Sequence, residues 1–285
     1  MSTEPDTVAG GLLHRLAAFT STPRGGNPAG VWIGDVLPSA DTMQRIAADV
    51  GFSETAFVAP AAGAERMVRY YSPQAEVAFC GHATIATGVV LGQGEGDGVY
   101  RLSTQVGEVP VAVRTHDGVR EASLTSVEPK HEPASDALVA EALAALGWRA
   151  DELDSPIPAV RAYAGVWHLV LAAASLDRLN RLEYDFARLK HVMQSEGLTT
   201  LQLVWRESPT VFHSRNPFPI GGVVEDPATG AAAAALGGYL RDSGLLAAPA
   251  TITIRQGEAM GRPSLLTVQI PPTGGIIVTG AAVPI

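Results

Sequence analysis

The sequence predicts an α+β protein made of two similar halves, each with a mixed or antiparallel sheet. Predicted strands outnumber helices and most are joined by short loops, whereas a doubly wound parallel sheet needs a long crossover after each strand. Each half also consists of a run of strands, a glycine-led helix of small residues, and further strands. The segment 128–135, which holds two prolines and much charge, is the predicted linker between the halves.

The first half begins with a polar segment, 1–10, that we expect to fray. Ser39 can cap a helix and Gly51 can end one, so a helix is predicted over 40–50. A second, apolar helix is predicted over 82–91, with a glycine-rich loop over 92–98 after it. Alternating and β-branched residues predict strands at 12–19, 31–33, 54–58, 67–71, 99–104 and 109–114.

The second half repeats this organisation. Helices are predicted over 136–146, 184–194 and 230–240, the last of them containing five consecutive alanines. The most basic stretch, 178–190, alternates with apolar and acidic residues and is interpreted as the solvated side of a helix. Strands are predicted at 159–163, 168–172, 201–205, 211–214, 250–254, 265–270 and 275–278.

Composition excludes several classes of protein. A net charge of -9 and no clustered basic residues argue against a nucleic-acid partner. A single cysteine, Cys80, excludes an internal disulfide, and no apolar run reaches the roughly 18 residues that span a bilayer. The first ten residues lack the basic and apolar regions of a signal peptide, so a cytoplasmic location without a membrane partner is expected.

Two glycine-led helix starts are candidate binding elements, Gly81-His82 and Thr229-Gly230 with Asp226 before it. Unpaired N–H groups at a helix start bind anions such as carboxylates, and glycine allows a ligand to approach closely. Asp226 or Thr229 could also cap the second helix. The alternative for both segments is the close packing of a buried helix.

Glu54 is a candidate acid/base group because it lies in an otherwise half-apolar predicted strand. Burying a carboxylate is costly unless it is paired or functional, and such surroundings suit a general acid/base. The alternative is an edge-strand glutamate that faces water. In Gly26-Asn27-Pro28, a turn signal, the asparagine amide could contact a ligand.

Other catalytic motifs are missing. The sequence contains no GxGxxG, no P-loop, no GxSxG elbow and, among its seven histidines, no HExxH or Cys/His spacing for a metal. Cofactor-free chemistry on a small acidic molecule is what remains.

Five segments together resemble the PhzF-like family, the phenazine-biosynthesis isomerase relatives with the diaminopimelate-epimerase-like fold. The resemblance extends over about residues 12–282 and is carried by 26–28, 51–57, 76–84, 225–230 and 256–264. It implies two pseudo-symmetric domains, each a sheet curled around a central helix. The first domain would be 10–127 with the C-terminal strand 274–285 returning to it, and the second 128–273.

The resemblance also implies the site. Glu54 matches the catalytic glutamate, and His82 and Asp226 match the catalytic histidine and aspartate. The substrate-binding positions match Asn27, Ser53, Gly81, Gly230 and Ala231. Family members often have serine where this chain has Ala231, so a hydroxyl contact is lost. The family is usually homodimeric and uses neither metal nor organic cofactor.

These observations predict a cofactor-independent isomerase that moves a proton, by a 1,3-shift through Glu54, on a small carboxylated substrate bound between two domains. A single-centre epimerase or racemase and a non-catalytic ligand-binding protein are the alternatives. A hydrolase using Cys80 is a third. A two-cysteine racemase is excluded because no second cysteine exists, and Cys80 is expected to be a small buried residue of the core.

Overall fold

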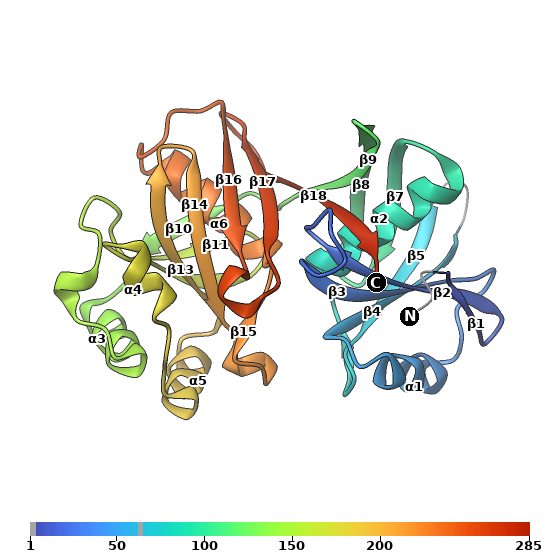
Figure 1. Cartoon of the computed structure of the whole chain (residues 1–285), viewed down its shortest axis with the longest axis horizontal. Coiled ribbons are helices and arrows are strands. Elements are labelled where there is room, and N and C mark those ends of the chain that lie inside the picture. The colour runs from blue at the N-terminus through green and yellow to red at the C-terminus, as the bar shows by residue number, and fades with distance from the viewer. Residues whose placement is uncertain (1–3, 62–64) are drawn as a thin grey trace. The chain divides into compact units, whose positions relative to one another are not determined.

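The computed structural model describes residues 4–61 and 65–285. Its internal contacts divide the chain into two compact units (Figure 1). One unit comprises the chain up to Thr125 together with Thr279–Ile285, and the other comprises Ser126–Val278. Each unit is built from a curled sheet and a central helix. None of the helices in these ranges is long and apolar enough to cross a membrane.

In the first unit the strand pairings close into a ring. The ring runs β2, β3, β4, β5, β7, β8, β9, β18 and back to β2, with parallel pairs at β3–β4 and β5–β7. The strands are β1 (Asp6–Val8), β2 (Gly11–Ala18), β3 (Asn27–Ile33), β4 (Glu54–Pro60), β5 (Glu65–Tyr71), β6 (Glu76–Val77), β7 (Gly98–Thr104), β8 (Gly107–His116), β9 (Val119–Thr125) and β18 (Ile277–Pro284).

Helix α2 (Gly81–Glu95) lies inside this ring and contacts β2, β3, β4, β7, β8 and β9 (Figure 1). Its side chains are buried without interruption from His82 to Gly92, as expected for a helix that is apolar on every face. At Gly88 an added Cβ would lie 2.7 Å from Val111 Cγ1, so the helix approaches β8 too closely for a side chain. Glycine is therefore required by the packing of α2 and not by its backbone conformation.

The predicted loop over 92–98 is wrong in its first half, because α2 continues through Gly92 and Gly94 to Glu95. Glycine disfavours helix by roughly 1 kcal/mol relative to alanine. At Gly92 packing overrides this preference. An added Cβ would lie only 2.6 Å from Val113 Cγ1, so only glycine lets the helix approach β8 this closely. The helix ends at Gly96, whose φ of 94° few other residues adopt.

Helix α1 (Ala40–Val50) connects the parallel strands β3 and β4 and matches its prediction at both ends. The Ser39 hydroxyl accepts a hydrogen bond from the N–H of Thr42, and Gly51 ends the helix in the left-handed conformation. Met43, Ile46 and Ala47 form one core cluster with Trp32 and Phe57.

The second unit has an open sheet in the order β10, β11, β12, β13, β14, β16, β17, with parallel pairs at β12–β13 and β14–β16. Two-residue β15 pairs with β14. The strands are β10 (Lys130–Pro133), β11 (Val160–Tyr163), β12 (Trp167–Ala172), β13 (Leu198–Ser208), β14 (Val211–Pro217), β15 (Glu225–Asp226), β16 (Ala250–Gln256) and β17 (Ser264–Ile270).

Helix α6 (Gly230–Asp242) packs on one face of this sheet, against β10, β11, β12, β13 and β17. Its alanines allow the close approach that α2 achieves in the first unit. On the other side, Leu169, Leu171, Leu201 and Leu203 form a core with residues of three further helices. These helices are α3 (Asp136–Leu146), α4 (Leu176–Asn180) and α5 (Phe186–Ser195).

The two units repeat one topology. In the first, α1 connects parallel strands β3 and β4, and α2 follows β6 and leads to β7. In the second, α4 and α5 connect β12 and β13, and α6 follows β15 and leads to β16. An arginine–glutamate pair recurs at the same place, Arg69–Glu76 and Arg215–Glu225, both at 2.5 Å. The predicted α+β class, with curled mixed sheets around central helices, is confirmed.

Several elements were not predicted. The segment 128–135 is not an unstructured linker, because Lys130–Pro133 pairs with β11 as strand β10. Within the tail 1–10, β1 pairs with β2. Strand β9 has a polar sequence and becomes a strand because β8 and β18 pair with it on either side. The basic stretch 178–190 is not one helix but spans the end of α4, a coil and the start of α5.

Candidate active site

Glu54 is the first residue of β4, which lies between β3 and β5. The alternative of an edge-strand glutamate is therefore wrong, because β4 has a partner on both sides. The Glu54 side chain is 19 % exposed, since it extends from the end of the strand where the turn 51–53 enters. The carboxylate is thus held by a rigid strand while it keeps access to a small ligand.

His82 lies beside Glu54 and is the second residue of α2. Its Nε2 is 3.4 Å from Glu54 Oε2 and 3.4 Å from Ser53 Oγ. The Asn27 amide Nδ2, 3.2 Å away, donates a hydrogen bond to His82 Nδ1. Since Nδ1 accepts, the neutral ring carries its proton on Nε2, toward Glu54. Asn27 therefore sets the tautomer that makes His82 a donor at the carboxylate.

Cys80 is a third polar group at this position. Its thiol donates to Glu54 Oε2 at 3.5 Å, and Sγ lies 3.4 Å from His82 Nδ1 and 3.8 Å from His82 Nε2. Cys80 is buried, as expected, but it is not a purely hydrophobic core residue, because it contacts the two titratable side chains of the site. The sequence signal that could have placed Cys80 in the site is its position two residues before His82.

Two buried hydroxyl groups hold the start of α2 in place, and sequence reasoning missed both. Thr84 Oγ1 donates to the Cys80 carbonyl at 2.7 Å, and the Tyr70 hydroxyl lies 2.6 Å from Thr84 Oγ1. Burial raises the pKa of Tyr70, so its phenol stays neutral. Tyr70 and Thr84 thereby hold the N-terminus of α2, which carries Cys80 and His82, in place.

The start of α2 can bind an anion. Its first N–H groups have no acceptor within the helix, and the helix dipole favours negative charge there. Gly81 is half-buried, and apart from its chain neighbours and its own helix no atom of the described residues lies within 4 Å of where its Cβ would be. The open space at Gly81 would admit a carboxylate near Glu54. Asn27, Ser53, Glu54, Gly81 and His82 are thus brought together in the first unit.

The other three predicted residues, Asp226, Gly230 and Ala231, lie together in the second unit, at the start of α6. Asp226 Oδ2 accepts a 2.5 Å hydrogen bond from Thr229 Oγ1. The Gln256 amide, from β16, donates to the Asp226 carbonyl at 2.8 Å and to Thr229 Oγ1 at 3.0 Å. All three predicted residues are half-buried.

The predicted cap by the Thr229 side chain is wrong. Thr229 occupies the N-cap position of α6, but its side chain makes no cap hydrogen bond. The reason is that the Thr229 hydroxyl is already bonded to Asp226 and Gln256. The Thr229 side chain therefore does not occupy the first N–H groups of α6, a type of site at which anions bind.

The turn after β16 supports this segment through the backbone of Gly257. Gly257 has a φ of 74°, and an added Cβ would lie 2.4 Å from the Arg262 carbonyl oxygen and 2.7 Å from that of Pro227. Only glycine fits there.

Residues 16–285 match the family model PhzC-PhzF, described as phenazine biosynthesis-like protein. The chain belongs to this family. It is 34% identical over 256 residues to the trans-2,3-dihydro-3-hydroxyanthranilate isomerase of Pseudomonas fluorescens, with 88% of this chain and 87% of the relative covered. It is 31% identical over 282 residues to the uncharacterized isomerase YfhB of Bacillus subtilis (strain 168), with 94% of each covered.

Its fold is similar to that of a solved PhzF family protein, the phenazine biosynthesis protein of Bacillus anthracis. The TM-score is 0.84 at 24% sequence identity, and 96% of each chain is covered. This PhzF-like protein is an isomerase of the family.

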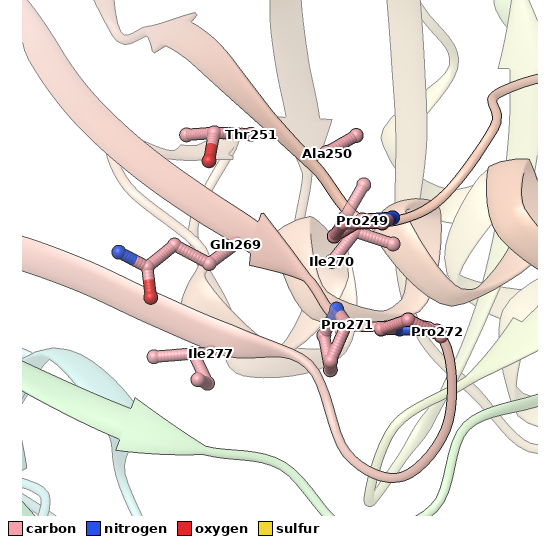
Figure 2. A pocket seen from close by; sticks show the side chains of 8 residues that line it. All are labelled: Pro249, Ala250, Thr251, Gln269, Ile270, Pro271, Pro272 and Ile277. Atoms are coloured by element: carbon pink, nitrogen blue, oxygen red, sulfur yellow. The ribbon is translucent and has the colours of Figure 1, made fainter.

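Two surface pockets of this PhzF-like isomerase lie apart from these groups. One, in the second unit, is lined by residues of β16, β17 and the adjoining proline segments (Figure 2). None of its eight lining residues is titratable, so it offers no group for proton transfer. The other, in the first unit, is at the opposite end of β4 from Glu54, near Val58 and Pro60.

Proposed function

We propose that this protein catalyses a 1,3-type proton shift on a small carboxylated substrate, with Glu54 as the group that moves the proton. The observation that carries the proposal is the Glu54–His82 pair. A carboxylate on a central strand lies 3.4 Å from an imidazole whose tautomer is set by a buried amide. This geometry supplies one base with a defined neighbouring donor.

In the proposed reaction Glu54 takes a proton from one carbon and returns it to another carbon on the same face of the substrate. His82 donates from Nε2 and keeps the Glu54 carboxylate in place. The start of α2 binds the substrate carboxylate through backbone N–H groups. A positioned acid/base contributes roughly 10²–10⁴-fold, and orientation of the substrate must supply much of the remaining acceleration.

The second unit enters the proposal through the family resemblance. Asp226 is expected to orient the substrate, and the start of α6, at Gly230 and Ala231, to bind it. The substrate named for the Pseudomonas fluorescens relative is an unsaturated ring that bears a carboxylate and an amino group. We propose a substrate of that class, with Ala231 as the position where specificity departs from relatives that have serine.

The experiment is a screen of small cyclic and amino-substituted carboxylic acids in D₂O, with proton exchange followed by NMR. We expect exchange with the wild type and a loss of about 10²–10⁴-fold with Glu54→Gln, which keeps the shape but not the base. Glu108→Gln, at an exposed glutamate of β8, is the control and should exchange normally. Near wild-type exchange by Glu54→Gln would contradict the proposal.

The same spectra separate the alternatives. Deuterium at a single inverted stereocentre would indicate an epimerase, and tight binding without exchange would indicate a ligand-binding protein. The homodimer that the resemblance implies stays a prediction, which sedimentation of the purified protein tests.

A further inference from the structure

We propose that Glu54, Cys80 and His82 form a binding site for a borderline-soft divalent cation, with Zn²⁺ as the preferred ion, and that the bound ion inhibits the enzyme. The three side chains offer a carboxylate oxygen, a thiolate sulfur and an imidazole nitrogen, all within 4.8 Å of one another. These are the three donor types that zinc takes in proteins.

The separations of the donor atoms match those of a tetrahedral ion. With metal–ligand bonds of about 2.0–2.3 Å and tetrahedral angles, neighbouring ligand atoms lie roughly 3.4–3.6 Å apart. In the structure Nε2 of His82 is 3.4 Å from Oε2 of Glu54, and Sγ of Cys80 is 3.5 Å from the same oxygen. The third edge, from Sγ to Nε2, is 3.8 Å. Because Sγ also lies 3.4 Å from Nδ1, it lies beside the imidazole ring and not in front of Nε2. An ion shared by the three side chains therefore requires the ring to turn until its Nε2 lone pair faces Sγ and Oε2.

The surroundings suit the ion as well. Cys80 is the residue immediately before the first turn of α2, so its backbone position is fixed by the helix. Metal-bound histidines donate their other ring N–H to an oxygen. A flip of the Asn27 amide would present its Oδ1 to His82 Nδ1 for this purpose. Glu54 is partly exposed, so the ion has a route in and a fourth position for water.

Bound metal would prevent proton transfer, because it would occupy Glu54 and the Nε2 atom of His82 at once. This consequence rests on the proposed function, whereas the binding itself does not. Local sequence spacing links only Cys80 with His82, since Glu54 precedes Cys80 by 26 residues. The Cys80 thiol thus makes the proposed proton-transfer site sensitive to metal ions.

Binding is tested by adding Co²⁺, as a spectroscopic stand-in for zinc, to the full chain after chelator treatment, and then displacing it with Zn²⁺. We expect one ion per chain and a thiolate-to-cobalt charge-transfer band that Zn²⁺ abolishes. Cys80→Ser and His82→Gln should lose the band and weaken Zn²⁺ binding by more than roughly 10–100-fold, the loss that follows when only a hydrogen-bond partner of a ligand is removed.

The matched control is His213→Gln, because His213 lies between the carboxylates of Glu207 and Glu258 at 2.7 and 3.0 Å. This variant should bind Co²⁺ and Zn²⁺ as the wild type does. Circular dichroism of each variant confirms that it is folded. Absence of stoichiometric binding, or equal binding by folded Cys80→Ser, would overturn the proposal.

Activity is measured separately, as proton exchange with and without Zn²⁺. We expect Zn²⁺ to inhibit the wild type and the chelator to restore it, while Cys80→Ser resists the ion. Zinc binding with unchanged exchange would overturn the inhibition. If no substrate shows exchange while Co²⁺ binds with the thiolate band, the proposed function fails and the metal site stands.

Discussion

At the scale of single residues, the chemistry of the first unit rests on the polar groups beside Glu54. His82, Ser53 and Cys80 all lie within 3.5 Å of a Glu54 oxygen or of the imidazole that faces it. Asn27, 2 % exposed, contacts the far nitrogen of the same ring. Asn27, which is not itself titratable, decides which ring nitrogen of His82 carries the proton.

Asn27→Asp should change which nitrogen of the His82 ring carries the proton. A carboxylate beside Nδ1 accepts instead of donating, so the ring would carry its proton on Nδ1 or become charged. We expect exchange to fall by roughly 10²–10⁴-fold, with a changed pH profile of the remaining activity. The measurement is the pH dependence of exchange, with the thermal midpoint as the check of folding. An unaltered pH profile at unaltered rate would show that Asn27 does not position His82.

At the scale of elements, the central helix of the first unit depends on glycine in two opposite ways. Gly88 is buried against β8 and β9, where an added Cβ would lie 2.7 Å from Val111 Cγ1 and 2.9 Å from Ala122 Cβ. Gly94, in the same helix, is exposed, and outside this helix no atom in the described part of the chain lies within 4 Å of that position. One glycine is needed for packing and the other only weakens the helix.

Gly88→Ala and Gly94→Ala should therefore change stability in opposite directions. Gly94→Ala should raise the free energy of unfolding by about 0.5–1 kcal/mol through helix propensity. Gly88→Ala gains the same propensity but overpacks the core at a cost of roughly 1–3 kcal/mol, so a net loss is expected. Urea denaturation of the two variants and the wild type measures both. Equal stabilisation by the two substitutions would contradict the packing described for α2.

At the scale of the whole molecule, the repeated topology places equivalent ion pairs in different surroundings. Glu225 and Arg215 have side chains 3 % and 13 % exposed, whereas Glu76 and Arg69 are 24 % and 32 % exposed. Arg69 holds the pKa of Glu76 below its usual value. The same pair is thus a buried contact in one unit and a partly solvated one in the other.

Neutralising the two glutamates should reveal this difference. Glu225→Gln leaves the buried Arg215 without its charge partner, and we expect a loss of about 3–5 kcal/mol in the free energy of unfolding. Glu76→Gln should lose no more than about 1 kcal/mol, because solvent screens Arg69. Chemical denaturation monitored by circular dichroism gives both values. Similar losses would mean that burial does not separate the two pairs.

The second unit also contains a buried polar group that sets the pH dependence of stability. His168, 0 % exposed, bonds through Nδ1 to Thr200 Oγ1 at 2.8 Å. Burial lowers the pKa of His168 to about 3, against an ordinary value of 6.5. The unfolded chain therefore binds a proton below pH 6.5 that the folded chain does not, so stability is full above that pH and falls toward pH 3.

Between pH 7.5 and pH 5 this histidine should lower the free energy of unfolding by about 2 kcal/mol. His168→Leu should flatten that part of the stability curve, and His191→Gln, at an exposed histidine of α5, should leave it unchanged. Urea unfolding across this pH range provides the measurement. A curve for His168→Leu as steep as that of the wild type would assign the pH dependence to other groups.

Features that depend only on neighbouring residues follow from local sequence rules. The cap at Ser39 and the stop at Gly51 set the bounds of α1, alternation marked most strands, and the excess of strands over helices indicated the α+β class. Other features depend on strands and side chains that are distant in the sequence. Strand β9 exists because β8 and β18 pair with it, and α2 extends through Gly92 because β8 requires a bare backbone there. Cys80 joins Glu54 and His82 for the same reason, since only the folded sheet brings residues 26 apart within 3.5 Å.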